Sequence, residues 1–270
     1  MSEAEELLGR LEAWFNPVEG SLTAFSGGVD SALVLFLSHR FLGEKGIGVI
    51  ADSPSLKRRD LNLARDFCSQ FGISLRVIQT GELENPNYAS NPNNRCFFCK
   101  DTLYRKMEAI HHEYPGFYLL NGTNRDDHGD YRPGLQAASN HGIHSPLSDC
   151  GIGKAQVRLL AKHFGLPVWN KPASPCLSSR IPYGQDVTEE KLAQIEAAET
   201  FLNELGFDEV RVRHFGEEAR IEVPATVVER LIPLKSEIQT RFTEIGFTTA
   251  TIDAEGLVSG KLNRAIVSHG

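Results

Sequence analysis

Three cysteines carry the most specific chemistry in the sequence. Cys96 and Cys99 form a C-x-x-C pair at a predicted loop-to-helix junction, and Cys176 follows eighty residues after the first. Three thiolates can hold a [4Fe–4S] cluster and leave one iron open for an added sulfide. A structural zinc site would instead need a fourth ligand. The side chains available for that position are His128, His144 and Cys150.

The surroundings of the other cysteines indicate ordinary structural roles. Cys68 falls on the apolar face of a predicted helix, so we expect it in the core. Cys150 is expected in a loop. Arg180 follows Cys176 by four residues, and its charge would favour the thiolate there. An odd total of five cysteines does not suggest a disulfide scaffold, so a reducing, cytoplasmic compartment is predicted.

A serine- and glycine-rich loop lies between a short apolar strand and an apolar helix. It reads Ser26-Gly27-Gly28-Val29-Asp30-Ser31. Two glycines let the backbone approach an anion closely, and the following helix N-terminus offers unpaired N–H groups. The two serine hydroxyls add donors. The loop lacks the lysine of GKS or GKT loops, so it suits adenylyl transfer, in which pyrophosphate leaves.

Acidic side chains in a long polar loop are candidates for holding Mg²⁺ against phosphates. Asp126, Asp127 and Asp130 lie close together there, and Asp30 beside the phosphate loop is a further candidate. An alternative is that these carboxylates only cap turns. The polar neighbours in the same loop are Gly122, Thr123, Asn124 and Arg132.

Two arginines, Arg211 and Arg213, are separated by one residue in a predicted strand. Side chains alternate along a strand, so both guanidinium groups would lie on one face. Such a pair could bind a phosphate or carboxylate, or could be two ordinary arginines of a sheet surface.

The elements that must position these residues follow from the apolar pattern. Strands alternating with helices specify a parallel sheet covered on both faces, an α/β fold. The predicted strands are 21–25, 46–51, 73–78 and 117–121, and the predicted helices are 4–15, 32–41, 56–71, 99–112 and 154–164. Three polar stretches, 82–95, 122–145 and 173–185, are predicted to be irregular.

The pattern changes after residue 186, where we place a domain boundary. The expected order is helix 188–205, strands 208–214 and 218–223, helix 225–245 and strand 248–252. This order predicts an α/β domain over 1–186 and a small α+β domain over 187–270, with roles in substrate binding or oligomerisation.

Composition argues against two classes of partner. The net charge is −7, whereas proteins that bind long nucleic acids usually carry a basic surface. No apolar run is long enough to span a bilayer, and the acidic N-terminal segment does not resemble a signal peptide. Neither nucleic acid nor membrane is therefore expected as a partner.

The phosphate-loop string matches the signature of the PP-loop ATP pyrophosphatases, which activate a carbonyl by adenylation. This resemblance places Asp52 and Ser53, at the end of the second strand, near the adenine of ATP. Three further strings narrow it to the sulfur transferases that mature the nickel-pincer cofactor of lactate racemase. These strings are Asn94-Arg95-Cys96-Phe97-Phe98-Cys99-Lys100, the segment from Gly122 to Gly134, and Pro175-Cys176-Leu177-Ser178-Ser179-Arg180. The similarity covers residues 5–264.

The resemblance implies ATP- and Mg²⁺-dependent adenylation of a carboxylate on pyridinium-3,5-biscarboxylic acid mononucleotide. Sulfur then displaces AMP to give a thiocarboxylate, and a second round treats the other carboxylate. The Arg211 and Arg213 pair, with Glu199, corresponds to the substrate-phosphate site, and Glu199 is also a candidate magnesium ligand. The resemblance further implies a homo-oligomer, of the size of a hexamer, and a nickel-inserting enzyme downstream. It does not identify the sulfide donor.

Several alternatives remain open at this level. One branch of the family gives up the sulfur of a single cysteine at the position of Cys176, leaving dehydroalanine. A transfer-RNA thiolation enzyme would share the loop and often the three cysteines. An ammonia-using synthetase of the same superfamily would have no use for the cysteine trio. A regulatory module would bind ATP without releasing pyrophosphate.

Overall fold

The computed structural model describes residues 2–129, 133–258 and 261. The chain divides into two compact units. The first combines Met1–Glu82 with Asn94–Ser174, and the second combines Leu83–Asn93 with Pro175–Gly270. The boundary predicted at residue 186 therefore lies inside the second unit, and the functional division into two domains stays a prediction.

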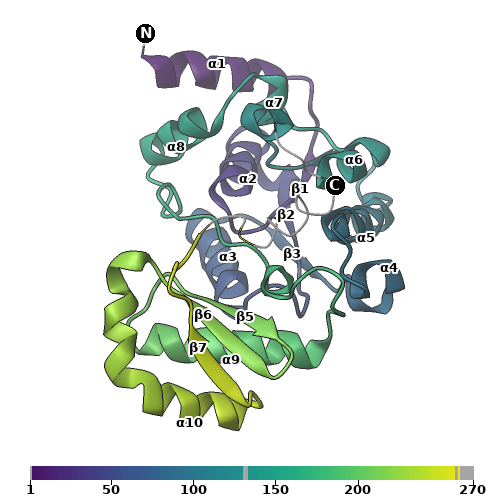
Figure 1. The fold of residues 1–270 in the computed structure, drawn as a ribbon. Coiled ribbons are helices and arrows are strands. Elements are labelled where there is room, and N and C mark those ends of the chain that lie inside the picture. Colours follow the sequence, from purple (N-terminus) through teal and green to yellow (C-terminus); the bar gives the residue numbers. More distant parts are fainter. Residues whose placement is uncertain (1, 130–132, 259–260, 262–270) are drawn as a thin grey trace. The chain divides into compact units, whose positions relative to one another are not determined.

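The first unit is built on a four-stranded parallel sheet in the order β3-β2-β1-β4 (Figure 1). Its strands are β1 (Ser21–Ala24), β2 (Gly46–Ala51), β3 (Leu75–Ile78) and β4 (Tyr118–Leu120). The two central strands, β1 and β2, are almost wholly buried, as expected for a parallel sheet covered on both faces. The predicted α/β fold is confirmed.

Helices cover both faces of this sheet. One core contains side chains of α1 (Glu3–Phe15), α2 (Val29–Leu42), α3 (Arg58–Phe71) and α8 (Lys154–His163). The other contains those of α5 (Arg95–His111) and α6 (Pro133–Asn140). Neighbouring residues of one strand enter different cores, as Leu119 and Leu120 do, because strand side chains alternate between faces.

Helix α3 illustrates how the sequence pattern produces a helix with one buried face. Leu61, Ala64, Phe67 and Cys68 are buried at helical spacing, and Gly72 ends the helix in the left-handed conformation. Burial raises the pKa of the Cys68 thiol to about 12. The prediction that Cys68 is a core residue is confirmed.

The three stretches predicted to be irregular contain short helices. These are η2 (Glu82–Glu84), α4 (Pro86–Ala89), η3 (Arg125–Gly129), α6, and η4 (Leu177–Arg180). In α4, Asn85 caps the first turn and Pro86 occupies the first helical position, so Asn and Pro begin a helix here rather than a loop. Two further short elements are η1 (Gly43–Lys45) and α7 (Pro146–Asp149).

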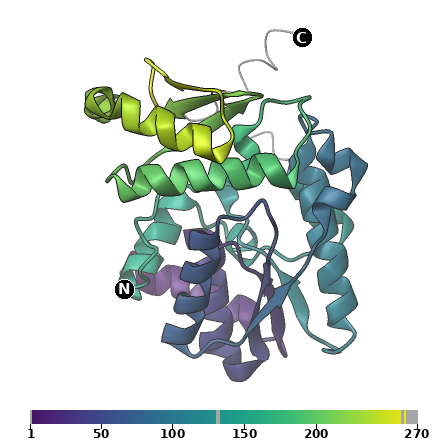
Figure 2. The same cartoon turned by 90° about the horizontal axis from the view of Figure 1, so that it is seen from below.

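The second unit contains a three-stranded mixed sheet in the order β5-β6-β7. Its strands are β5 (Arg211–Phe215), β6 (Glu218–Glu222) and β7 (Thr249–Ile252). Helices α9 (Glu189–Glu204) and α10 (Lys235–Ile245) lie side by side against the sheet and share one core with it (Figure 2). The helix predicted over 225–245 is instead η5 (Ala225–Leu234) followed by α10, with Pro233 before the junction.

The helices within the described ranges were also compared with the dimensions of a bilayer. None of them is both long and apolar enough to cross a membrane.

Candidate functional site

A cavity of about 400 Å³ opens in the first unit at the phosphate loop. Ser26, Asp30 and Ser31 contribute one part of its lining. Helix α5 contributes a second part through Cys96, Lys100 and Tyr104. The segment after β4 and the start of α6 complete it with Asn121, Gly122, Thr123, Asp127, Pro133, Gly134 and Leu135. The cavity therefore gathers several residues that the sequence singled out.

The phosphate loop is arranged to present backbone donors. Gly27 has a φ of 71°, which is readily adopted only by glycine, and Gly28 precedes α2 without a side-chain cap for its first turn. The Ser31 hydroxyl donates to the Gly28 carbonyl (3.1 Å) and lies 3.0 Å from the Ser26 hydroxyl. The N-terminal amides of α2 can thus bind an anion such as pyrophosphate.

The chain after β4 lies directly against this loop. A Cβ atom at Gly122 would lie 2.5 Å from the Ser31 nitrogen, so only glycine permits the observed approach. The Asn121 side chain accepts a hydrogen bond from the Thr123 amide (2.9 Å) and another from the Ser145 hydroxyl (2.9 Å). The predicted neighbours Gly122, Thr123 and Asn124 are therefore held beside the start of α2.

Asp30 has two partners that come from distant parts of the sequence. Asn124 donates to one carboxylate oxygen (3.2 Å), and the ammonium group of Lys154 contacts the other. Sequence analysis did not single out Lys154, because it begins α8, 124 residues after Asp30. The absence of a lysine from the loop itself is thus offset by one supplied from another helix.

The neighbouring acids Asp126 and Asp127 have different roles. Asp126 accepts a hydrogen bond from the Lys154 amide (2.7 Å), and this bond, followed by one from Arg125, lowers the pKa of its carboxyl group. It caps α8, which confirms the alternative that it stabilises a turn. Asp127 accepts from the Asn124 amide (3.0 Å) and lines the cavity. The candidates Asp130 and Arg132 lie outside the described residues.

The candidate adenine site lies at the end of β2. Asp52 contacts Arg58 and accepts a hydrogen bond from Gln79 (3.2 Å), and the hydrogen bond from Arg58 is the main reason that its pKa is lowered. Ser53 is buried, and its hydroxyl accepts from the Ser55 amide (3.2 Å). Both side chains follow directly from a correctly predicted strand. Their role toward adenine stays a prediction.

The cysteine pair lies in the first turn of α5, which begins at Arg95 instead of the predicted Cys99. Cys96 is exposed and lines the cavity, and Cys99, three residues later, is half-buried on the same side of the helix. Cys176 belongs to the second unit, where it is half-buried immediately before η4. Among the described residues, no three His, Cys, Asp or Glu side chains are gathered as a metal site.

Cys150 is half-buried at the end of α7, and its sulfur lies 3.6 Å from the Arg10 carbonyl oxygen. Burial is the main reason that the pKa of its thiol is raised, to about 11. A thiol that stays protonated at neutral pH is a poor nucleophile and metal ligand.

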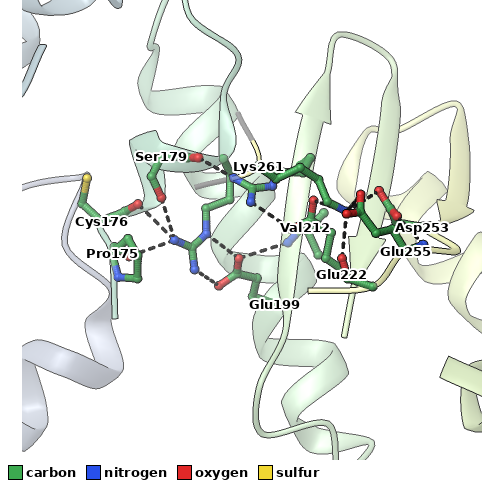
Figure 3. A network of polar contacts seen from close by, with 12 residues as sticks. Pro175, Cys176, Ser179, Glu199, Val212, Glu222, Asp253, Glu255 and Lys261 are labelled. Carbon is green, nitrogen blue, oxygen red and sulfur yellow. Dashed lines mark hydrogen bonds and ion pairs between the residues drawn. The ribbon is translucent and has the colours of Figure 1, made fainter. Parts of the chain in front are cut away.

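The second unit contains a buried network of arginines and glutamates (Figure 3). Arg180 donates to both oxygens of Glu199 (2.7 and 3.1 Å), and Glu199 also accepts from the Val212 amide (3.1 Å). Arg180 reaches Cys176 through the carbonyl oxygen (3.2 Å), whereas the sulfur points away from the network in Figure 3. Arg180 therefore fixes the backbone of this segment, which is a different role from the expected effect on the thiolate.

The two arginines of β5 differ in environment. Arg213 is buried and donates to Glu222 (2.8 Å) and to the Ser179 carbonyl (2.7 Å), while its Nε atom has no hydrogen-bond partner among the described residues. Arg211 is partly buried; burial, followed by the charges of Arg180 and Arg213, lowers its pKa. This region is thus electrostatically unfavourable for a further cation near Arg211 and favourable for an anion.

The ammonium group of Lys261 adds to this network. It lies 3.0 Å from Asp253 and 3.5 Å from each of Glu222 and Glu255. Its partners raise the pKa of Lys261 despite an opposing effect of burial. Sequence analysis did not identify Lys261, because its partners are distributed over the end of β6 and the following turn.

Comparisons with known proteins agree with this geometry. The family model described as NAD synthase matches residues 14–91, which include the phosphate loop. An uncharacterized protein of Synechocystis sp. is 42% identical over 264 residues, covering 97% of this chain and 98% of that protein. A glutamine-hydrolyzing GMP synthase of Thermococcus kodakarensis is 25% identical over 198 residues, 68% of this chain and 64% of its own.

The parallel sheet and the serine–glycine loop at the start of α2 define the chain as a PP-loop protein, a class of ATP-dependent enzymes. A more specific relative is the pyridinium-3,5-bisthiocarboxylic acid mononucleotide synthase of Lactiplantibacillus plantarum. It is 34% identical over 241 residues, covering 89% of this chain and 87% of that protein. The chain belongs to the family of this synthase.

Proposed function

We propose that this protein is an ATP-dependent sulfur transferase acting on pyridinium-3,5-biscarboxylic acid mononucleotide. It adenylates a carboxylate, releases pyrophosphate, and replaces AMP by sulfur to give a thiocarboxylate, once for each carboxylate. The observation that carries the proposal is the cavity in which the phosphate loop, Asp127 and Cys96 meet. The similarity to the L. plantarum synthase supports the choice of substrate.

The activation step uses the phosphate loop. A carboxylate oxygen of the substrate attacks the α-phosphorus of ATP, and the bond to the β-phosphate oxygen breaks as pyrophosphate leaves. The amides at the start of α2 and the Ser26 and Ser31 hydroxyls stabilise the charge on the leaving pyrophosphate. Lys154, which contacts Asp30, is close enough to this loop to add a positive charge there.

Magnesium fits two of the three candidate carboxylates better than the third. Asp30 and Asp127 both line the cavity and would hold Mg²⁺ against the phosphates. Glu199 is buried, and both of its oxygens already accept hydrogen bonds from Arg180. Magnesium at Glu199 stays a prediction that requires displacing Arg180.

The donor set of the cysteines fits an iron–sulfur cluster. Cys96 and Cys99 present two thiols on one side of a helix N-terminal turn, where the helix dipole favours thiolates. We propose that these two and Cys176 hold a [4Fe–4S] cluster. Such a cluster leaves one iron open to bind the additional sulfide that becomes the sulfur of the product.

Substrate phosphate is assigned to Arg211 and Arg213 of β5, with Glu199 nearby in α9. The lowered pKa of Arg211, caused by burial and by neighbouring arginines, supports an anion site. Because Arg213 already binds Glu222 and Ser179, Arg211 would make the first contact with the phosphate. The protein is further proposed to form a homo-oligomer, and a nickel-inserting enzyme would consume the thiolated product.

The activation step is tested by pyrophosphate release from Mg-ATP with and without the dicarboxylate mononucleotide. We expect release that depends on the substrate and survives in the triple variant Cys96→Ala, Cys99→Ala, Cys176→Ala, because adenylation does not use sulfur. A salt-sensitive affinity for transfer RNA, with no response to the mononucleotide, would favour a transfer-RNA thiolation enzyme instead.

The sulfur source is tested by iron and acid-labile sulfide contents after anaerobic reconstitution. We expect about four of each per chain, lost on replacing Cys96, Cys99 or Cys176 by alanine and kept in a Cys150→Ala control. A single turnover that converts Cys176 to dehydroalanine, without iron, would replace the cluster by the sacrificial route.

A further inference from the structure

The segment after α8, residues 168–174, lies against the phosphate loop and has no role so far. Its backbone is fixed by Arg158 of α8, which donates to the carbonyl oxygens of Trp169 (2.8 Å) and Lys171 (3.1 Å). The Lys171 amide also donates to the Val168 carbonyl (3.1 Å). The backbone at Lys171 is therefore held in place before any ligand binds.

The side chain of Lys171 bridges the phosphate loop and α3. Its ammonium group donates to the Gly27 carbonyl oxygen (3.1 Å) and to Asp60 (3.0 Å). The second oxygen of Asp60 accepts from the Ser174 hydroxyl (2.8 Å). Asp60 and Lys171 have side-chain exposures of only 11% and 19%, so water competes weakly for this contact.

Gly27 is the residue whose backbone most needs such support. It lies in the left-handed conformation (φ 71°) and packs on the first turn of α3, where an added Cβ would meet the Asp60 carbonyl at 3.5 Å. A loop that binds anions through amides must keep its carbonyl oxygens away from the anion, because their negative ends repel it. The hydrogen bond from Lys171 holds the Gly27 carbonyl toward α3.

We propose that Lys171 is a positioning residue for pyrophosphate binding, acting through the Gly27 carbonyl and held in turn by Asp60 and Ser174. The proposal rests on the proposed use of ATP. Its effect is specific to the β- and γ-phosphates of ATP, because the group that it fixes is the phosphate loop. AMP, which lacks these phosphates, should bind almost independently of Lys171.

The competing role is direct contact between Lys171 and a phosphate. The variant Asp60→Asn separates the two roles. If Lys171 acts through Gly27, removing the carboxylate that holds it weakens ATP binding. If Lys171 binds phosphate directly, the same variant removes a competing anion, and ATP binds as well or more tightly.

The experiment measures the dissociation constants of Mg-ATP, pyrophosphate and AMP by calorimetry for the wild type and four variants. These are Lys171→Met, Lys171→Arg, Asp60→Asn and Ser174→Ala, with Lys45→Met as control. Lys45 is an exposed lysine that precedes β2 and so lies at the opposite edge of the parallel sheet from the phosphate loop.

We expect Lys171→Met to weaken ATP and pyrophosphate binding about tenfold, the size of one hydrogen bond to a charged group, with AMP binding changed less than about twofold. Asp60→Asn should follow it, Ser174→Ala should have a smaller effect in the same direction, and Lys171→Arg should restore part of the affinity. Lys45→Met should match the wild type.

Three results would overturn the proposal. Equal losses for ATP and AMP would indicate general damage to the fold, and tighter ATP binding in Asp60→Asn would indicate direct contact. Unchanged binding in every variant would leave Lys171 without a role while the proposed function stands. A wild-type protein that binds neither ATP nor pyrophosphate would instead contradict the proposed function, and the inference with it.

Discussion

The phosphate-loop cavity and the arginine–glutamate network differ in how their polar groups are satisfied. In the cavity, backbone amides and side chains such as Asp127 line an open space and can receive a ligand without first losing a buried partner. In the network, Arg180 and Arg213 are each buried against a glutamate. The first region is organised for binding, whereas the second stabilises its own unit and must exchange partners before its arginines bind an anion.

The largest expected effect is therefore on stability, in the network. Glu199→Ala leaves the fully buried Arg180 without its carboxylate, and breaking such a pair costs about 3–5 kcal/mol. Denaturant unfolding measures the loss. The matched control is Glu244→Ala, which breaks the exposed pair with Arg241 and should cost less than about 1 kcal/mol. Equal losses for the two variants would mean that burial does not distinguish the pairs.

An intermediate effect is expected where the backbone closes on the phosphate loop. Gly122→Ala places a methyl group 2.5 Å from the Ser31 nitrogen, and relieving that overlap should cost about 1–3 kcal/mol and displace the start of α2. ATP affinity should fall together with the unfolding midpoint. Gly9→Ala in α1, where nothing lies within 4 Å, is the control and should be neutral or slightly stabilising. Unchanged ATP affinity in Gly122→Ala would contradict the close approach.

The smallest effect concerns the wall of the cavity formed by α5 and α6. His141 bonds Asp101 and Glu108 of α5 (2.9 Å each); burial opposes its charged form, but these carboxylates outweigh burial and raise its pKa. A raised folded-state pKa stabilises fully below the ordinary value of 6.5, and the gain disappears as pH rises through the folded value.

His141→Gln should therefore lose more stability at acidic than at alkaline pH, by about 1 kcal/mol or less. The measurement compares unfolding of the wild type and variant below and above neutrality. His112→Gln, an exposed histidine at the end of α5, serves as the control. A loss that is the same at both pH values would show that the ion pairs contribute nothing.

Local pattern was sufficient for much of the fold. Strand β2 was predicted at its observed bounds, because a continuous apolar run between polar segments is typical of a central parallel strand. The start of α5 was missed by four residues, since Arg95 and the residues after it give no clear apolar period. Short helices such as α4 depend on capping by single residues, which a pattern over longer windows does not detect.

The candidate site was predictable only in part, for a different reason. The phosphate loop is a continuous string, and its glycines and serines indicate their chemistry directly. The contacts of Lys154 with Asp30 and of Lys171 with Gly27 join residues more than a hundred positions apart. No local spacing indicates such pairs, because they exist only after the sheet has brought separate loops to one edge.

The most direct test of the account is the mass of the product formed anaerobically from the dicarboxylate mononucleotide, Mg-ATP and a sulfide source by the reconstituted protein. The account predicts a substrate in which one and then both carboxylates have exchanged oxygen for sulfur, with one AMP and one pyrophosphate released per exchange. Pyrophosphate release that leaves only an adenylate or unchanged substrate, with all three cysteines intact and iron bound, would contradict it.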